Sequence, residues 1–217
     1  MSTIFINSTQ YVYAIKLGVT PMTDFNVILF DDFETLDAFG PAEIIGRTPN
    51  SYNLEFFSME GGIVTSSQNV KVHTKPLSEM NQNGVLLIPG GFGTRALVND
   101  DTFISRLKEV ASAASYVLTV CTGSGLLAKT GLLDGHRATS NKRAFSWAES
   151  VSNSVMWINH ARWVVAGCYY TSSGVSAGMD MALGFVADLH GADVAADVAS
   201  GIEYIWNSDP NNDPFSI

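Results

Sequence analysis

The sequence predicts an α/β fold, in which a doubly wound, mostly parallel sheet is flanked by helices on both faces. Short, continuous apolar runs such as Asn26–Phe30 and Val85–Ile88 are typical of strands that are covered on both sides. Segments with helical periodicity, such as Phe103–Ala114, alternate with these runs along the chain. Alternation of this kind favours parallel strands joined by crossover helices.

The first half of the chain begins with a buried strand and a helix. Pro41 stands early in that helix, where its missing N–H does least harm. A polar turn between two short apolar segments predicts a hairpin at the edge of the sheet. In chain order the expected elements are a strand at Asn26–Phe30, a helix at Asp37–Gly46, a strand at Leu54–Phe57, a hairpin of Ile63–Ser66 with Val70–Thr74, and a strand at Val85–Ile88.

The second half continues the alternation. Apolar residues recur at helical spacing in the first helix of this half, which ends before another apolar run. Ala166–Gly167 separates two short strand-like segments, which we expect to form a hairpin or one bent strand. The expected elements are a helix at Phe103–Ala114, a strand at Tyr116–Val120, a helix at Thr122–Lys129, short strands at Trp163–Val165 and Tyr169–Thr171, and closing helices at Ser176–His190 and Ala192–Tyr204.

The length of 217 residues suits one globular domain, which we place at residues 22–206. Residues 1–21 are expected to be an N-terminal extension containing a candidate strand at Tyr11–Ile15; Met22 as the natural start is the alternative. The segment 207–217 is polar and contains proline, and we expect it to be irregular.

Composition excludes several classes of function. The formal net charge of −9 disfavours binding to nucleic acid, because an acidic protein repels phosphate. No run approaches the roughly 20 apolar residues of a membrane span, and the N-terminus lacks the order of a signal peptide. Two cysteines, Cys121 and Cys168, provide neither a disulfide framework nor a zinc cluster, so we expect reduced thiols and a cytoplasmic protein.

Cys121 is the most informative residue, because it follows a strand and opens a helix. Free N–H groups and the positive helix end would stabilise its thiolate there. Gly123 and Gly125 remove side-chain bulk at a sharp strand-to-helix turn. A buried structural cysteine is the alternative for a lone cysteine.

Two further segments should lie at the same edge of the sheet, beyond the carboxyl ends of the strands. Gly90–Gly91 either simply ends its strand or, with the Thr122 N–H, forms a pocket for developing negative charge. Asp37 either caps a helix or is a partly buried acid. Glu43 is its rival on the same helix, where an outward position is expected.

Four segments together resemble the ThiJ/PfpI superfamily over roughly residues 25 to 205. They are LDAFGPAE (Leu36–Glu43), LLIPGGFGTRAL (Leu86–Leu97), TVCTGSGLLAKTGLLDGHRATS (Thr119–Ser140) and TSSGVSAGMDMAL (Thr171–Leu183). The resemblance implies a flavodoxin-like fold of the class I glutamine amidotransferase type. It also implies a cysteine nucleophile and, by the habit of the superfamily, a homodimer.

The residue after the cysteine distinguishes the branches of the ThiJ/PfpI superfamily. Proteases of the PfpI type have a histidine there, whereas this chain has Thr122, which weakens a protease or amidase function. A Cys-Thr-Gly sequence with an aspartate in the LD-x-x-GP segment is instead similar to isonitrile hydratase. That resemblance implies catalytic roles for Cys121, Thr122 and Asp37, with a small-molecule substrate and no metal or cofactor. Gly90, Gly91 and Gly123 would provide the pocket for charge.

Two departures from that pattern bear on the substrate pocket. Asn141–Lys142 stands where the hydratases have His-Trp. Ser172–Ser173–Gly174 stands where they tend to have glycines, which makes Ser173 a candidate substrate-binding residue. Two alternatives remain at this stage: a glyoxalase- or deglycase-like enzyme, and a redox-sensing stress protein without turnover.

Overall fold

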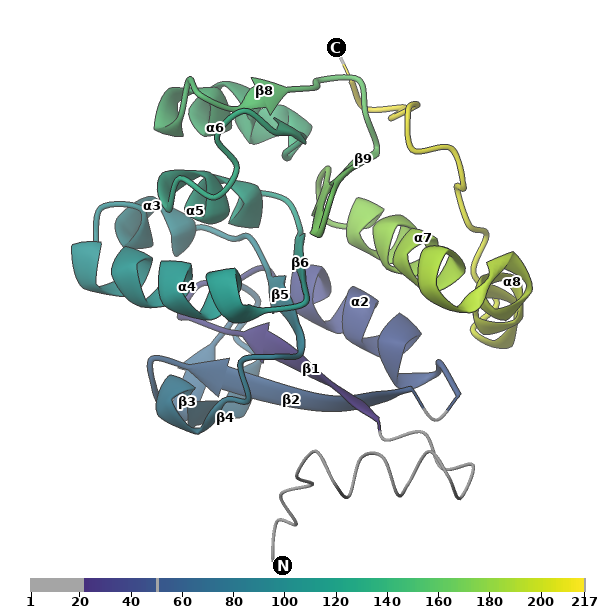
Figure 1. Cartoon of the computed structure of the whole chain (residues 1–217), viewed down its shortest axis with the longest axis horizontal. Helices are drawn as coiled ribbons and strands as arrows, with labels where there is room; N and C mark the ends of the chain where they lie inside the picture. The colour runs from purple at the N-terminus through teal and green to yellow at the C-terminus, as the bar shows by residue number, and fades with distance from the viewer. Residues whose placement is uncertain (1–21, 50, 217) are drawn as a thin grey trace, which may run out of the picture.

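The computed structural model describes residues 22–49 and 51–216 as a three-layer α/β/α fold (Figure 1). The central sheet has eight strands in the order β3-β4-β2-β1-β5-β6-β10-β9. The six inner strands run parallel to their neighbours, and the two edge strands β3 and β9 run antiparallel. The predicted fold class is therefore confirmed.

The strands at the middle of the sheet are buried on both faces, as their apolar sequences predict. Phe25 and Val27 of β1, Leu87 of β5 and Leu118 of β6 have no exposed surface or nearly none. The strands are β1 (Thr23–Ile28), β2 (Tyr52–Ser58), β3 (Glu60–Thr65), β4 (Lys71–Pro76), β5 (Val85–Ile88), β6 (Tyr116–Thr119), β9 (Trp163–Ala166) and β10 (Tyr169–Ser172).

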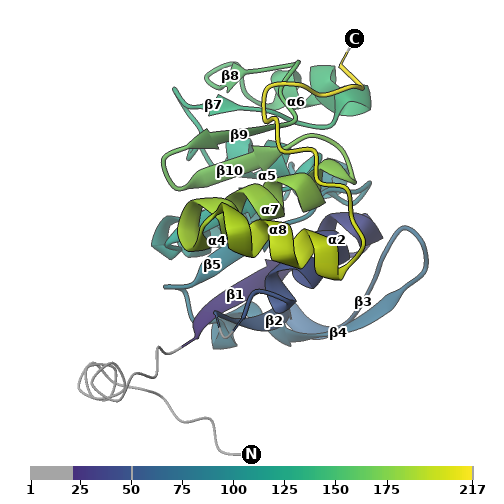
Figure 2. The same cartoon turned by 90° about the vertical axis from the view of Figure 1, so that its right-hand side faces the viewer.

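Helices cover both faces of the sheet. One face carries α2 (Thr35–Gly46), α7 (Ala177–His190) and α8 (Ala192–Gly201), which Figure 2 shows in front of the strands. The other face carries α3 (Thr94–Leu97), α4 (Asp101–Ala113) and α5 (Gly123–Lys129) (Figure 1). A smaller unit lies beyond α5 and contains β7 (Arg137–Ala138), the 3-10 helix η2 (Lys142–Ala144), α6 (Phe145–Val151) and β8 (Met156–Trp157).

Most elements expected from the sequence are present, with ends shifted by a few residues. The two predicted hairpins, β3 with β4 and β9 with β10, are both confirmed. The first strand was placed too late, because Leu29 and Phe30 are buried but lie just beyond β1. The sequence analysis missed α3, α6, β7 and β8, which are too short for periodicity to reveal.

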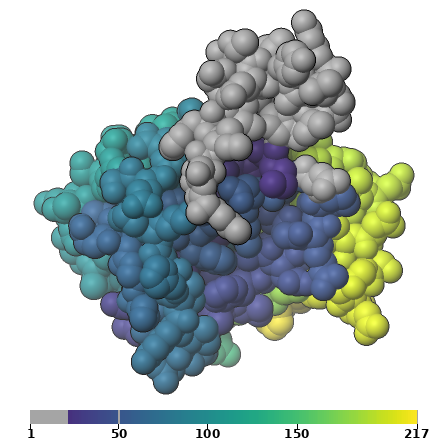
Figure 3. All heavy atoms as spheres, turned by 90° about the horizontal axis from the view of Figure 1, so that it is seen from below, coloured from purple at the N-terminus to yellow at the C-terminus, as the bar shows by residue number. Residues whose placement is uncertain are grey.

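The last residues of the described chain contain no helix or strand, yet they pack against the fold. The Arg162 N–H donates to the carbonyl of Pro210 over 2.8 Å, and Asp213 is buried. Another sequence-distant contact joins the two ends of the domain: the Tyr52 hydroxyl lies 2.8 Å from Nε2 of His190. In Figure 3 the N-terminal strands and the C-terminal helices accordingly share one face.

The expected extension 1–21, with its candidate strand at Tyr11–Ile15, lies outside the described residues. Among the residues that are described, none of the helices has the length and apolar character needed to span a bilayer.

Candidate active site

The strand order changes direction at β1, whose neighbours are β2 on one side and β5 on the other. Ligands in open α/β sheets bind beyond the carboxyl ends of the strands at such a point. The chain after β1, β5 and β6 meets there. A bridge between Phe33 and Gly91 and the hydrogen bond from the Glu34 N–H to the Gly90 carbonyl (2.8 Å) join the first two of these loops.

Cys121 occupies the turn between β6 and α5 with a φ of 58°, a left-handed conformation that L residues rarely adopt. Its own backbone groups hold it there. The N–H donates to the Ser173 carbonyl (3.0 Å), and the carbonyl accepts from the hydroxyls of Ser124 (2.9 Å) and Ser140 (3.0 Å). A strained nucleophile turn of this kind lifts the side chain above the sheet.

Asp37 lies in the first turn of α2 and is completely buried. Oδ2 accepts the Gly90 N–H over 2.9 Å, so the carboxyl does not cap its own helix. Oδ1 is buried without a hydrogen-bond partner in the described structure, and Cys121 has a small lowering effect on the pKa of this carboxyl group. The rival Glu43 is exposed and pairs with Arg47, which confirms its expected outward position.

The pKa values of this pair are both raised. Burial raises the pKa of Asp37 to about 8, with a smaller contribution from the charge of Glu34, against the lowering effect of the Gly90 N–H. Burial and then the charge of Asp37 raise the pKa of the Cys121 thiol far above its ordinary value. Near neutral pH the resting site therefore holds a protonated carboxyl group beside a protonated thiol.

Glycine is required at several positions of the site because neighbouring loops approach its backbone too closely for a side chain. A Cβ at Gly90 would lie 2.6 Å from the Thr122 nitrogen and 2.9 Å from Oδ2 of Asp37, and one at Gly123 would lie 2.3 Å from the Ile88 carbonyl oxygen. Gly91 has a φ of 127°, which only glycine adopts readily. Any side chain at these positions would push the three loops apart.

Thr122 connects the loops through its hydroxyl. Oγ1 accepts the Gly91 N–H (3.1 Å) and the Thr94 hydroxyl (3.1 Å). The Gly91 N–H, which the sequence analysis assigned to a pocket for charge, is thus directed at this hydroxyl. The Thr122 N–H instead acts on Cys121, where it partly lowers the pKa of the thiol. Ser173 meets the site through its backbone carbonyl, which accepts from Cys121.

Comparison with known proteins identifies the family. The DJ-1/PfpI family matches residues 25–188. The chain belongs to the DJ-1/PfpI family. An isonitrile hydratase of Pseudomonas putida is 29% identical over 180 residues, which cover 82% of this chain and 76% of that protein.

Two solved structures support the DJ-1/PfpI fold. A ThiJ/PfpI family protein from Pseudomonas syringae has a TM-score of 0.76 at 24% identity, covering 99% of this chain and 84% of the other. The DJ-1beta protein of Drosophila melanogaster has a TM-score of 0.72 at 22% identity, covering 85% of this chain and all of that one. At these identities the likeness concerns the fold.

Two residues that affect Cys121 of this DJ-1/PfpI chain were not among the predicted site residues. The side chain of Asn141 partly lowers the pKa of the Cys121 thiol. The guanidinium of Arg95 stacks 3.7 Å from the centre of the Trp147 ring, and its charge interacts with Cys121. Arg95 and Asn141 stand inside or beside the segments that carried the family resemblance, but nothing in the sequence connects them with Cys121.

The four histidines do not contribute to the site. His190 bonds to Tyr52 and His136 packs edge-on against Tyr169, while His160 accepts a backbone hydrogen bond from Asp213. His73 lies on the edge hairpin, in β4. Within residues 22–49 and 51–216, no three His, Cys, Asp or Glu side chains are grouped as metal ligands would be.

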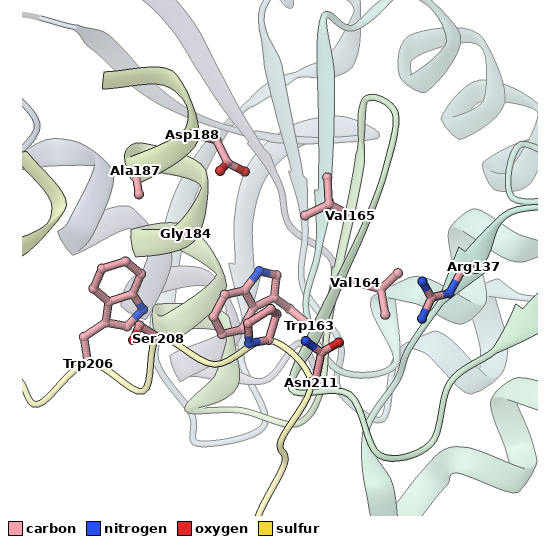
Figure 4. A pocket seen from close by; sticks show the side chains of 11 residues that line it. Arg137, Trp163, Val164, Val165, Gly184, Ala187, Asp188, Trp206, Ser208 and Asn211 are labelled. Atoms are coloured by element: carbon pink, nitrogen blue, oxygen red, sulfur yellow. The ribbon is translucent and has the colours of Figure 1, made fainter. Parts of the chain in front are cut away.

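A pocket of about 380 Å³ lies elsewhere, between β9, α7 and the C-terminal segment (Figure 4). Trp163 lies near its middle, between Trp206 on one side and Arg137 on the other, and Asp188 projects from α7. None of the site residues described above lines this pocket.

Proposed function

We propose that this protein hydrates organic isonitriles to N-substituted formamides, with Cys121 as nucleophile and Asp37 as acid and base. The observation that carries the proposal is the contact between a buried thiol and a buried carboxyl group that is protonated at neutral pH. The similarity to isonitrile hydratase supports it independently.

An isonitrile carbon needs both a proton and a nucleophile, and the two must arrive at the same atom. A carboxylic acid beside a thiol supplies this combination, because the acid donates a proton as the sulfur attacks. The unpaired Oδ1 of Asp37 is available for that transfer, since Oδ2 is occupied by the Gly90 N–H.

In the first step the acid proton moves to the isocyano carbon, the sulfur bonds to the same carbon, and the thiol proton passes to the carboxylate. The product is a thioimidate, R–N=CH–S–Cys121, with Asp37 again protonated. Water then adds to the carbon and the nitrogen gains a proton. Breaking of the C–S bond releases R–NH–CHO and restores the thiol. The net reaction therefore converts isonitrile plus water into the N-substituted formamide.

Other residues would assist these steps. The Thr122 N–H partly lowers the pKa of the Cys121 thiol and would stabilise the negative charge of the sulfur as it attacks. The Thr122 hydroxyl, held by Gly91 and Thr94, would orient water or the substrate nitrogen. The proposal requires no metal or organic cofactor.

The test is turnover of cyclohexyl isocyanide by the purified protein, with the formamide followed by chromatography. Cys121→Ala should abolish turnover, and Cys168→Ala is the matched control, because that free cysteine lies in the turn between β9 and β10. Because the acid form of Asp37 is needed, the rate should fall as the pH rises through about 8. Turnover that persists in Cys121→Ala would reject the proposal.

Methylglyoxal consumption, measured with the same preparations, distinguishes isonitrile hydration from the glyoxalase- or deglycase-like alternative, which would use the same thiol. The raised pKa of Cys121 disfavours the other alternative, a peroxide sensor, because peroxide reacts with the thiolate.

A further inference from the structure

The backbone of Cys121 is held by two segments that lie far from it in the sequence. Its N–H donates to the Ser173 carbonyl (3.0 Å), and its carbonyl accepts the Ser140 hydroxyl (3.0 Å). The further bond from the Ser124 hydroxyl lies within the turn itself. A residue with a φ of 58° keeps that conformation only where its surroundings enforce it. The position of Cys121 therefore depends on what holds Ser173 and Ser140.

Ser173 is held by Arg162, the residue before β9. The Ser173 N–H donates to the Arg162 carbonyl over 2.9 Å, and the Arg162 N–H donates to the Pro210 carbonyl over 2.8 Å. The guanidinium is buried, pairs with Asp180, and has Nη1 3.6 Å from Oδ1 of Asp213. This segment is therefore joined to the C-terminal segment through its backbone and through a buried ion pair.

Ser140 is held by Lys142, which follows it by two residues. Nζ of Lys142 donates to the Ala161 carbonyl (2.8 Å) and to the Thr139 hydroxyl (2.9 Å), so it fastens this segment to the chain before β9. The same nitrogen lies 3.8 Å from Oδ2 of Asp213, and only 5% of the Lys142 side chain is exposed. Both segments thus reach the same carboxylate.

Asp213 is fixed in the position that both cations share. Its N–H donates to the His160 carbonyl (2.9 Å), its Oδ1 accepts the Phe215 N–H (3.0 Å), and its side chain has no exposed surface. Oδ2 has no hydrogen-bond partner among the described residues, so the charges of Lys142 and Arg162 compensate its burial. Removal of this carboxylate would leave two buried cations without the anion that they share.

We propose that the buried cluster of Lys142, Asp213 and Arg162 positions Cys121 for reaction, with Asp213 as the residue that joins the two segments. The C-terminal segment, which contains no helix or strand in its described part, is thereby part of the active-site framework. Asp213 acts through other residues and is a positioning residue. The inference rests on the proposed function in taking Cys121 as the nucleophile, but the positioning itself can be measured without a substrate.

Asp213→Asn removes the charge and keeps the local turn, because the Oδ1 of asparagine still accepts the Phe215 N–H. Asp209→Asn is the matched control. Asp209 is an exposed residue of the same segment, and its Oδ1 accepts the N–H of Asn211, again two residues later (2.9 Å). Each variant loses one negative charge, so a difference between them comes from the buried cluster. Thermal unfolding checks that both are folded.

Amide hydrogen exchange, measured by NMR under native conditions, reports how firmly the two segments are held. In Asp213→Asn the amides of Cys121 and Ser173 should exchange about tenfold faster than in the parent, because less free energy is needed to open them locally. The Leu29 amide, which is bonded to β2, should exchange as in the parent. Asp209→Asn should match the parent at all three amides.

Turnover of cyclohexyl isocyanide gives the second readout. A displaced nucleophile slows the chemical step more than it weakens binding, so Asp213→Asn should lower kcat by about tenfold or more and change KM by less than about twofold. Asp209→Asn should leave both parameters unchanged. An unchanged kcat in Asp213→Asn would overturn the positioning role.

Exchange of the Cys121 and Ser173 amides within about twofold of the parent in Asp213→Asn would overturn the inference. Equal acceleration at Leu29 would also overturn it, because Asp213 would then only stabilise the fold as a whole. Local acceleration in a protein that does not hydrate cyclohexyl isocyanide would uphold the positioning of Cys121 while rejecting the proposed function.

If Asp213→Asn does not fold, Lys142→Met decides, because it leaves Asp213 paired with Arg162. Faster exchange at Cys121 but not at Leu29 would uphold the inference, and exchange as in the parent at both amides would overturn it.

Discussion

Two buried aspartates, Asp37 and Asp180, have the same side chain and the same lack of exposed surface, yet their surroundings are opposite. Asp180, in α7, has partners on both oxygens. Oδ2 accepts from Nε of Arg162 (2.9 Å) and lies 2.7 Å from Nη2 in the same ion pair, while Oδ1 accepts from the Tyr204 hydroxyl (3.0 Å) and the Asn207 N–H (3.0 Å). Asp37 has one backbone N–H on Oδ2, the neighbouring thiol and an unpaired Oδ1.

The difference separates a carboxylate with partners for its charge from a carboxyl group without them. Three hydrogen bonds and the positive charge of Arg162 offset the cost of burying the charge of Asp180, so this residue fastens the chain before β9 and the C-terminal segment to α7. Asp37 lacks such compensation, and its pKa rises to about 8. A buried acid that has too few donors keeps its proton near neutral pH and is able to transfer it.

The largest expected effect is that of Asp180→Ala, which should lower the free energy of unfolding by about 3–5 kcal/mol, because it leaves the buried guanidinium of Arg162 without its main partner. Urea denaturation measures this. The double variant Arg162→Met/Asp180→Leu should be less destabilised than Asp180→Ala, since both members of the buried ion pair are removed together and buried Asp213 keeps Lys142 as a partner. Equal or greater destabilisation of the double variant would contradict the assignment of Asp180 as the partner of a buried charge.

Asp37→Asn should have a smaller effect on stability, and one that depends on pH. Between about pH 4 and 8 the folded parent keeps a proton on Asp37 that the unfolded chain releases, so its free energy of unfolding falls as the pH rises. The slope is at most about 1.4 kcal/mol per pH unit. Asparagine does not titrate, so this part of the slope should disappear.

Denaturation of the parent and Asp37→Asn at pH 5, 6.5 and 8 tests that expectation. The free energy of unfolding of the variant, relative to that of the parent, should increase between pH 5 and pH 8. Alkaline destabilisation of equal size in both proteins would mean that the carboxyl of Asp37 is already ionised in the folded state. The variant should also lose isonitrile turnover, because it retains no acid beside Cys121.

The smallest effect is expected for Glu43→Gln on the same helix as Asp37. Glu43 is exposed and pairs with Arg47 one turn later, and such surface pairs contribute about 0.3–0.5 kcal/mol. Its unfolding free energy should stay within about 0.5 kcal/mol of the parent at pH 5 and pH 8 alike. If Glu43→Gln altered the pH dependence of the free energy of unfolding, the difference in burial between Glu43 and Asp37 would not explain their different effects on stability.

The sequence contained enough information to predict the order of elements and three residues that the structure brings together. Cys121 and Thr122 directly follow an apolar strand and Asp37 follows one by seven residues, all in segments that carry the family resemblance. Arg95 was missed, and Asn141 was noted only as a departure bearing on the substrate pocket, because neither follows a predicted strand. The polar segment 207–217 contains no helix or strand among its described residues, but its Asp213 is buried against Lys142 and Arg162, which its composition did not indicate.

The sequence by itself determined the α/β alternation, the buried strands and the strand-to-helix turn at Cys121, because periodicity and glycine placement express local backbone preferences. Only the tertiary structure decided which oxygen of Asp37 has a donor and that Asp180 has partners for its charge. Those contacts join residues far apart in the chain, such as Gly90 and Asp37 at a separation of 53 residues. They depend on strand order and on side-chain burial, which no local pattern encodes.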